Sequence, residues 1–245
     1  MQYAECNRGL DVLLLFCQAP MELRPRTRRL ARTFLVEGAY EAILENILSG
    51  ALPSGTTVSE VALARDLNVS RTPVHQALAR LAKEGLIEHR SGLQPRIARF
   101  NREDVIEIYD MRLLLETAAT QRAAKRMDPR VLADLTREAA ELAASPDGAE
   151  WTRQALDFDA RFHDAVAAAS GNRRLRQEIA KYRLLVRAFC RLTGNSENLR
   201  DALREHQAVL RALAERQPQA AGQAMAQHVQ KRVDAVLGTL YREAK

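Results

Sequence analysis

Helical periodicity through the second half of the chain constrains the fold more than any other feature. From Asn101 onward, apolar residues recur at the three- and four-residue spacing of amphipathic helices. Turn-forming residues interrupt this pattern at Asp128-Pro129, Ser145-Pro146-Asp147-Gly148, Ser170-Gly171-Asn172, Thr193-Gly194-Asn195 and Gln217-Pro218. These breaks divide residues 101–245 into about six helices of ordinary length. The sequence therefore predicts an all-α helical bundle for this segment.

Composition excludes several classes of protein. Aromatic residues make up 5% of the 245 residues, which disfavours a sheet-rich fold. The longest apolar run, 12–17, is far shorter than the roughly 20 residues that a membrane span needs, and no secretory cleavage site follows it. Cys6, Cys17 and Cys190 form no metal or redox spacing. We therefore expect a cytoplasmic protein with no membrane contact.

Residues 34–100 show a different pattern, of shorter elements. Ser59 and Ser70 are predicted N-caps, because a serine side chain accepts hydrogen bonds from the free N–H groups at a helix start. Pro73 suits a first helical turn, and Gly50 and Gly85 are helix stops. The sequence therefore predicts three short helices over 34–49, 60–66 and 71–83.

Two short segments, 86–89 and 96–99, are predicted strands on either side of Ser91-Gly92. Three helices and a hairpin are the elements of a winged helix-turn-helix, whose third helix enters the major groove of DNA. We therefore expect contacts to double-stranded DNA from the start of the third helix and from the hairpin. The candidate residues are Ser70, Arg71, Thr72, His75, Arg90, Ser91 and Gly92.

The charge distribution favours a polyanionic partner for this unit. Residues 35–67 hold one basic and five acidic residues, whereas residues 68–100 hold six basic and two acidic residues. A unit with one basic half suits a phosphate backbone. Winged helices also serve as protein-interaction modules, though less often when the third helix and the wing are basic.

The predicted organisation has three parts. Residues 1–33 are expected to be a flexible N-terminal extension, with Met21 as an alternative start to Met1. Arginines cluster near the end of this extension, where a phosphate contact is the alternative to a flexible tail. Residues 34–100 form the predicted DNA-binding unit, and residues 101–245 the predicted effector-binding, metal-binding and dimerisation domain.

The DNA-binding segment resembles the GntR family of bacterial transcription regulators. The resemblance rests on Pro53-Ser54-Gly55, on Leu63-Ala64 and above all on Val69-Ser70-Arg71-Thr72-Pro73-Val74. It implies a regulator of transcription. One recognition helix reads only half of a pseudo-palindromic operator, so we expect a homodimer. His75 stands where the family usually has arginine, and its smaller charge and reach predict a different operator preference.

Four polar residues of the helical segment fall on apolar helix faces. Asp159 and His163, four residues apart, share one face, and His206 and His228 lie on the apolar stripes of two later helices. Buried ionisable groups need partners. Three imidazoles and one carboxylate suit a divalent metal ion, Zn²⁺ first and Ni²⁺, Mn²⁺ or Fe²⁺ as alternatives. A core cluster whose polar groups satisfy one another is the competing interpretation.

The helical segment resembles the effector domain of FadR-type GntR regulators, the FCD domain. The matching motifs are Ile108-Tyr109-Asp110-Met111-Arg112, Asp159-Ala160-Arg161-Phe162-His163, Glu205-His206 and His228. The resemblance implies that Asp159, His163, His206 and His228 hold a divalent cation whose coordination a small organic acid completes. It also implies that Arg112 meets the carboxylate of that effector.

For Arg112, an interhelical salt bridge, with Glu116 or Asp110 as partner, is the alternative. Arg183 and Arg187 are further candidates for effector binding.

These features predict a ligand-responsive transcription regulator rather than an enzyme. A metal-dependent hydrolase with a DNA-binding appendage is the first alternative, because three histidines and a carboxylate also describe a Lewis-acid site. Such an enzyme needs a general base, and Asp164 and Glu205 neighbour metal-ligand candidates in sequence, so we expect them to point away. A regulator with a purely structural metal is the second alternative.

Overall fold

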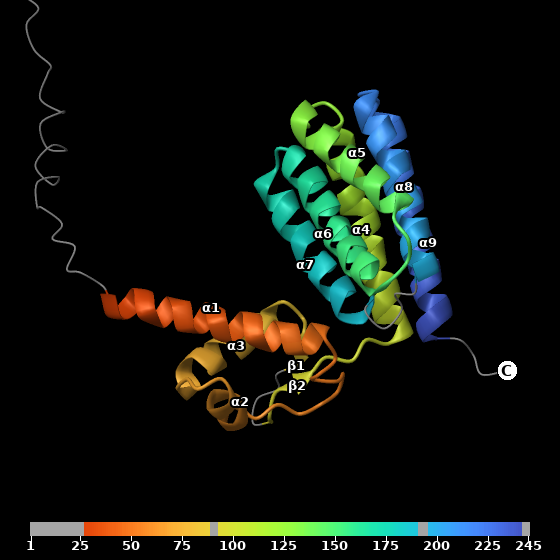
Figure 1. Ribbon diagram of the computed structural model, residues 1–245. Coiled ribbons are helices and arrows are strands. Elements are labelled where there is room, and N and C mark those ends of the chain that lie inside the picture. The colour runs from red at the N-terminus through yellow and green to blue at the C-terminus, as the bar shows by residue number, and fades with distance from the viewer. Residues whose placement is uncertain (1–26, 89–92, 191–195, 242–245) are drawn as a thin grey trace, which may run out of the picture.

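The computed structural model describes residues 27–88, 93–190 and 196–241 and shows two helical units (Figure 1). The first unit pairs two short antiparallel strands, with Ile87 opposite Ile97 and Glu88 opposite Arg96. Its elements are α1 (Thr27–Leu48), α2 (Glu60–Asp66), α3 (Arg71–Lys83), β1 (Ile87–Glu88) and β2 (Arg96–Ile97). This is the predicted winged helix-turn-helix.

Helices α2 and α3 have the predicted bounds, but α1 is longer than predicted. It begins at Thr27 rather than at residue 34, so residues 27–33 are helical. The apolar pattern could not show this, because it appears only where a helix face is buried, and Phe34 is still 77% exposed. The rest of the expected extension, with Met21, lies outside the described residues.

The cap predictions have different outcomes. The Ser59 side chain accepts a hydrogen bond from the backbone N–H of Ala62, as predicted for an N-cap. Ser70 occupies the N-cap position of α3 with extended backbone but makes no capping hydrogen bond. Its exposed hydroxyl is therefore available to other partners.

Among the described residues, six helices form the second unit, as the breaks in periodicity predict, and Figure 1 shows them packed side by side as a bundle. They are α4 (Arg102–Ala123), α5 (Pro129–Ala144), α6 (Ala149–Ala169), α7 (Arg173–Cys190), α8 (Ser196–Ala214) and α9 (Pro218–Leu240). Asn101 and Asp104 form a reciprocal capping box at the start of α4. The break at 193–195 lies outside the described residues.

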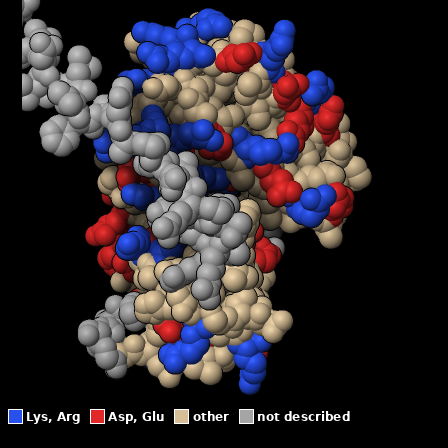
Figure 2. Space-filling model, turned by 90° about the vertical axis from the view of Figure 1, so that its left-hand side faces the viewer, with Lys and Arg blue, Asp and Glu red and all other residues tan. Residues whose placement is uncertain are grey.

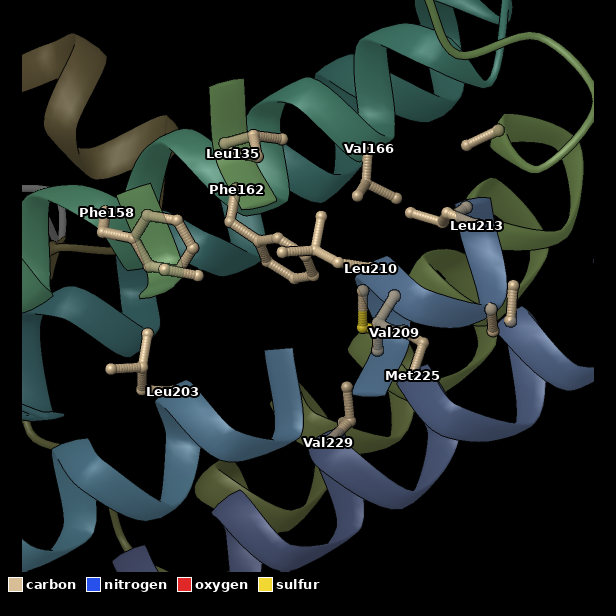
Figure 3. Packing of buried hydrophobic residues seen from close by; sticks show 14 of the residues in the cluster. Leu135, Phe158, Phe162, Val166, Leu203, Val209, Leu210, Leu213, Met225 and Val229 are labelled. Carbon is tan, nitrogen blue, oxygen red and sulfur yellow. The ribbon is translucent and has the colours of Figure 1, made fainter. Parts of the chain in front are cut away.

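Apolar side chains from α6, α8 and α9 form the centre of the bundle (Figure 3). Phe158 and Phe162 of α6 face Leu203 and Leu210 of α8 across this core. Burying each of these side chains contributes about 1.5–3 kcal/mol. The core therefore holds three helices in fixed register, and these three helices carry the polar residues of the candidate site.

A second core lies inside the winged helix, and α7 of the bundle contributes to it. Leu184 and Leu185 of α7 pack against this core, while Val186 belongs to the core of the bundle. One helix is thus shared between the two units.

The surface of the bundle carries both signs of charge. On the face that Figure 2 shows, Lys and Arg side chains lie beside Asp and Glu side chains over much of the bundle. Among the helices that the structure describes, none combines the length and the apolar character that a membrane span requires.

Candidate metal centre

Three histidines from three helices meet inside the bundle. His163 of α6, His206 of α8 and His228 of α9 are 1–2% exposed, so their predicted inward orientation is confirmed. Each offers one ring nitrogen, and these three nitrogens all lie within 4.8 Å of one another. The His206 and His228 ring centroids are 4.5 Å apart.

The apolar core positions these histidines. Phe162 precedes His163 on α6, and its ring centroid lies 4.3 Å from that of His206. Leu203 and Leu210 flank His206 at three- and four-residue spacing, which places all three on one face of α8. The apolar stripes that build the core therefore also carry the imidazoles into it.

The inward-facing nitrogens lack partners. Nε2 of His163, of His206 and of His228 is buried and has no hydrogen-bond partner among the described residues. A buried polar group left without a partner costs about 1–3 kcal/mol. Three such atoms in one cluster match the donor set of a divalent metal ion, so the residues present fit one.

Asp159 lies at the edge of this cluster and is one quarter exposed. Its Oδ1 atom is 3.6 Å from His163 Nε2 and 3.5 Å from His206 Nε2. Its Oδ2 atom accepts a hydrogen bond from Arg183 of α7. Burial would raise the pKa of Asp159, but Arg183 and the two histidines hold that pKa well below its ordinary value. Asp159 is therefore an anionic oxygen donor beside the histidines.

Two of the histidines contact a carboxylate through Nδ1. His228 Nδ1 lies 3.0 Å from Glu205 Oε2, and His163 Nδ1 contacts Glu116. An ionised carboxylate only accepts, so the proton of the Glu205–His228 hydrogen bond lies on Nδ1 and the lone pair of His228 lies on Nε2. Burial, followed by the neighbouring histidines, lowers the pKa of His206 and of His228 well below the ordinary value. These two imidazoles are therefore neutral, as metal ligation requires.

The expectation for Glu205 was wrong. Its carboxylate does not avoid the cluster but reaches His228 on the neighbouring helix, and sequence adjacency to His206 gave no sign of that contact. Asp164 does point elsewhere, because it pairs with Arg176 at 2.7 Å. The partnership of Glu116 with His163 was also missed, since it joins α4 to α6.

Arg112 is buried and pairs with Glu116, one of its two expected salt-bridge partners, but within one helix rather than between helices. Its Nε donates to Glu116 Oε1 at 2.6 Å, within the same helix. Its Nη2 has no partner among the described residues. Burial opposes the charge of Arg112, but Glu116 raises its pKa above the ordinary value. The salt bridge thus leaves part of the guanidinium fork unused.

An open cavity of about 1770 Å³ reaches this centre from the surface. Asp159 and His228 line it, together with Arg112 and the two other candidate arginines, Arg183 and Arg187. The cavity therefore combines the edge of the histidine cluster with several guanidinium groups, which suits an anionic ligand.

The predicted DNA-contacting residues of α3 are exposed, whereas Pro73 and Val74 between them are buried. The exposed set is Ser70, Arg71, Thr72 and His75. Glu60 of α2 lies 3.7 Å from Arg71 Nη2 and 2.8 Å from His75 Nδ1. The remaining candidates, Arg90, Ser91 and Gly92, lie outside the described residues.

Comparison with known proteins gives two family matches. A model of the FCD domain matches residues 107–231, and a model of bacterial regulatory proteins of the gntR family matches residues 35–93. An HTH-type transcriptional regulator from the TAR-I ttuE-ttuC' intergenic region of Agrobacterium vitis is 34% identical over 142 residues, which are 55% of this chain and 80% of that protein.

Two further similarities cover more of the chain. The probable D-xylose utilization operon transcriptional repressor of Paenarthrobacter nicotinovorans is 28% identical over 209 residues, 83% of this chain and 89% of that protein. The structure of McbR/YncC from E. coli superposes with a TM-score of 0.69 at 20% identity, covering 82% of this chain and 96% of the other, so the two share a fold.

Proposed function

The chain belongs to the GntR family of bacterial transcription regulators with an FCD domain, and from that premise we propose that a small carboxylate, bound at a divalent metal ion, controls its affinity for operator DNA. The proposal assigns residues 34–100 to DNA binding and residues 101–245 to sensing and dimerisation. A homodimer would place one α3 helix in each half of a pseudo-palindromic operator.

One observation carries the metal part of this proposal. One ring nitrogen from each of three buried histidines lies within 4.8 Å of the other two, and all three Nε2 atoms lack a hydrogen-bond partner among the described residues. Glu205 and Glu116 contact the Nδ1 atoms of His228 and His163. The ligands would be Asp159, His163, His206 and His228. Three nitrogens and one oxygen suit Zn²⁺ first, with Ni²⁺, Mn²⁺ and Fe²⁺ as alternatives. When bound, such an ion offers a carboxylate ligand a Lewis-acid site.

The arginines support a carboxylate as the effector. Arg112 is held by Glu116 through Nε, its Nη2 has no partner among the described residues, and Arg112 lines the cavity. A guanidinium fork binds a carboxylate through parallel N–H groups, which a lysine ammonium cannot do. Arg183 and Arg187 add positive charge along the same cavity.

Helix α7 offers a route from this site to the DNA-binding unit. Arg183 contacts Asp159, and the next two residues, Leu184 and Leu185, pack against the core of the winged helix. A ligand that favours one position of α7 would therefore favour one arrangement of the DNA-binding units.

The test is a titration of operator DNA with the metal-loaded full-length protein, in which binding is measured by fluorescence anisotropy. The titration is repeated in the presence of each of a panel of mono-, di- and hydroxycarboxylates. We expect at least one compound to change operator affinity at least fivefold. Intact operator binding that no carboxylate alters would contradict the effector role.

Tight metal binding together with that negative result would favour the purely structural metal. Against the hydrolase alternative, the similar proteins from Agrobacterium vitis and Paenarthrobacter nicotinovorans are named as a transcriptional regulator and a transcriptional repressor, which supports a non-enzymatic role.

A further inference from the structure

We propose that Glu60 fixes the proton of the His75 imidazole on Nδ1, so that His75 presents an acceptor to the major groove and selects adenine or cytosine in the operator. The inference rests on the proposed role of α3 in the groove. In it, His75 is the base-specificity residue and Glu60 is a positioning residue.

The contact that carries the inference joins two helices of the winged helix. His75 lies one turn beyond Arg71 on α3, and its side chain is 59% exposed. Its Nδ1 atom lies 2.8 Å from Oε1 of Glu60, the first residue of α2. The Glu60 side chain is only 21% exposed, and the cap of Ser59 fixes the backbone beside it.

The second oxygen of the Glu60 carboxylate lies near Arg71, the first residue of α3. Glu60 Oε2 is 3.7 Å from Arg71 Nη2. One carboxylate therefore orients two exposed side chains at the start of the recognition helix, and it does so from a helix that need not itself enter the groove.

The chemistry of the pair decides what His75 can read. An ionised carboxylate has no proton to give, so the hydrogen of the Glu60–His75 bond belongs to Nδ1. In the neutral ring Nε2 then carries a lone pair, and no partner of Nε2 is found among the described residues. In the major groove the donors are the N6 amine of adenine and the N4 amine of cytosine, whereas guanine presents the acceptors N7 and O6.

An arginine at this position would select differently. Its guanidinium has donors only, and the base that accepts two of them in the major groove is guanine. His75→Arg should therefore change the preferred base at one position of each half-site, while contacts from Arg71 and Thr72 remain.

The first arm of the test determines which ring nitrogen of His75 carries the proton. We would record ¹⁵N spectra of histidine-labelled full-length protein at pH 8.5, where an ordinary imidazole is neutral, and assign His75 by the signal lost in His75→Gln. The wild type should show the Nδ1–H tautomer, Glu60→Ala should lose it, and Glu41→Ala, the same charge change on exposed α1, should keep it. A wild-type Nε2–H tautomer, or no effect of Glu60→Ala, would overturn the proposal.

The second arm of the test determines which base each protein prefers in the operator half-site. Wild type and His75→Arg would each select half-sites from a random DNA pool at pH 8.5. We expect adenine or cytosine for the wild type and guanine for the variant at one shared position, each preferred about five- to tenfold. Identical selected bases at every position, with specific binding by both proteins, would overturn the inference alone. Failure of the wild type to bind any DNA would instead overturn the proposed function.

Discussion

The guanidinium of Arg183 binds the carboxylate of Asp159, and this contact connects the histidine cluster to the helix that touches the DNA-binding unit. On the same helix, a Leu185 methyl group lies 3.4 Å from where a side chain on Gly85 would begin. Gly85 has a positive φ of 82° and forms the turn directly after recognition helix α3. The route from candidate metal ligand to recognition helix is therefore short and continuous.

Leu185→Ala should weaken the coupling between the two units without weakening the metal site. The side chain is partly buried, so its loss should cost less than the ~2–5 kcal/mol of a fully buried leucine. The measurement compares operator affinity with and without the active carboxylate, which should differ less in the variant. Leu114→Ala, at a 66% exposed position of α4, is the control. An unchanged carboxylate response in Leu185→Ala would remove α7 from the route.

Glu205→Gln should weaken metal binding about 10- to 100-fold, because the carboxylate orients His228 and strengthens it as a ligand. Competition against a chelator of known affinity measures this change. Glu215→Gln, the same substitution at an exposed position beyond α8, should leave the metal affinity unaltered. Equal metal affinities for the two variants would argue against an orienting role for Glu205.

The sequence predicted the bounds of α2 and α3, the number of bundle helices and the burial of three histidines, because all of these follow from spacing along one helix. It did not predict the partners of those histidines. Glu116 and Glu205 reach them across helix pairs, and such distances depend on how helices pack. For the same reason, the sequence did not predict the Glu60–His75 contact, which joins α2 to α3.

Other failures of prediction have local causes. Periodicity placed the start of α1 too late, because Phe34 and Leu35 near that start are exposed and add no buried stripe. For Arg112, by contrast, the expected pairing with Glu116 is confirmed through Nε, and the effector contact stays a prediction for Nη2, which has no partner among the described residues.

Arg112→Lys should reduce the response to the carboxylate while the metal stays bound. Lysine keeps the positive charge near Glu116 but lacks the second donor of the fork. We expect the concentration of carboxylate that gives half of the maximal change in operator affinity to rise at least tenfold. Arg211→Lys, exposed on α8, is the matched control. A normal response in Arg112→Lys would place the effector carboxylate elsewhere.

The metal-free protein should lose stability as the pH falls from 7 to 5. In the folded state burial holds the pKa of His206 and of His228 well below 6.5, whereas in the unfolded chain both return to about that value. Below pH 6.5 the unfolded state therefore binds more protons than the folded state, so the free energy of unfolding decreases as the pH decreases.

Thermal unfolding in chelator at pH 8, 7, 6 and 5 measures this dependence. His206→Phe should flatten it, because one of the two protonatable rings is gone. A melting temperature that stays constant from pH 7 to pH 5 would show that these rings do not resist protonation.

The metal content of the untagged protein decides whether the three histidines form a metal site. Elemental mass spectrometry should find about one divalent ion per chain in the wild type and in His75→Ala, whose histidine lies outside the cluster, and almost none in His206→Ala. Absence of metal from the wild type, with wild type and His206→Ala equally stable, would contradict the claim and make the three histidines part of the apolar core.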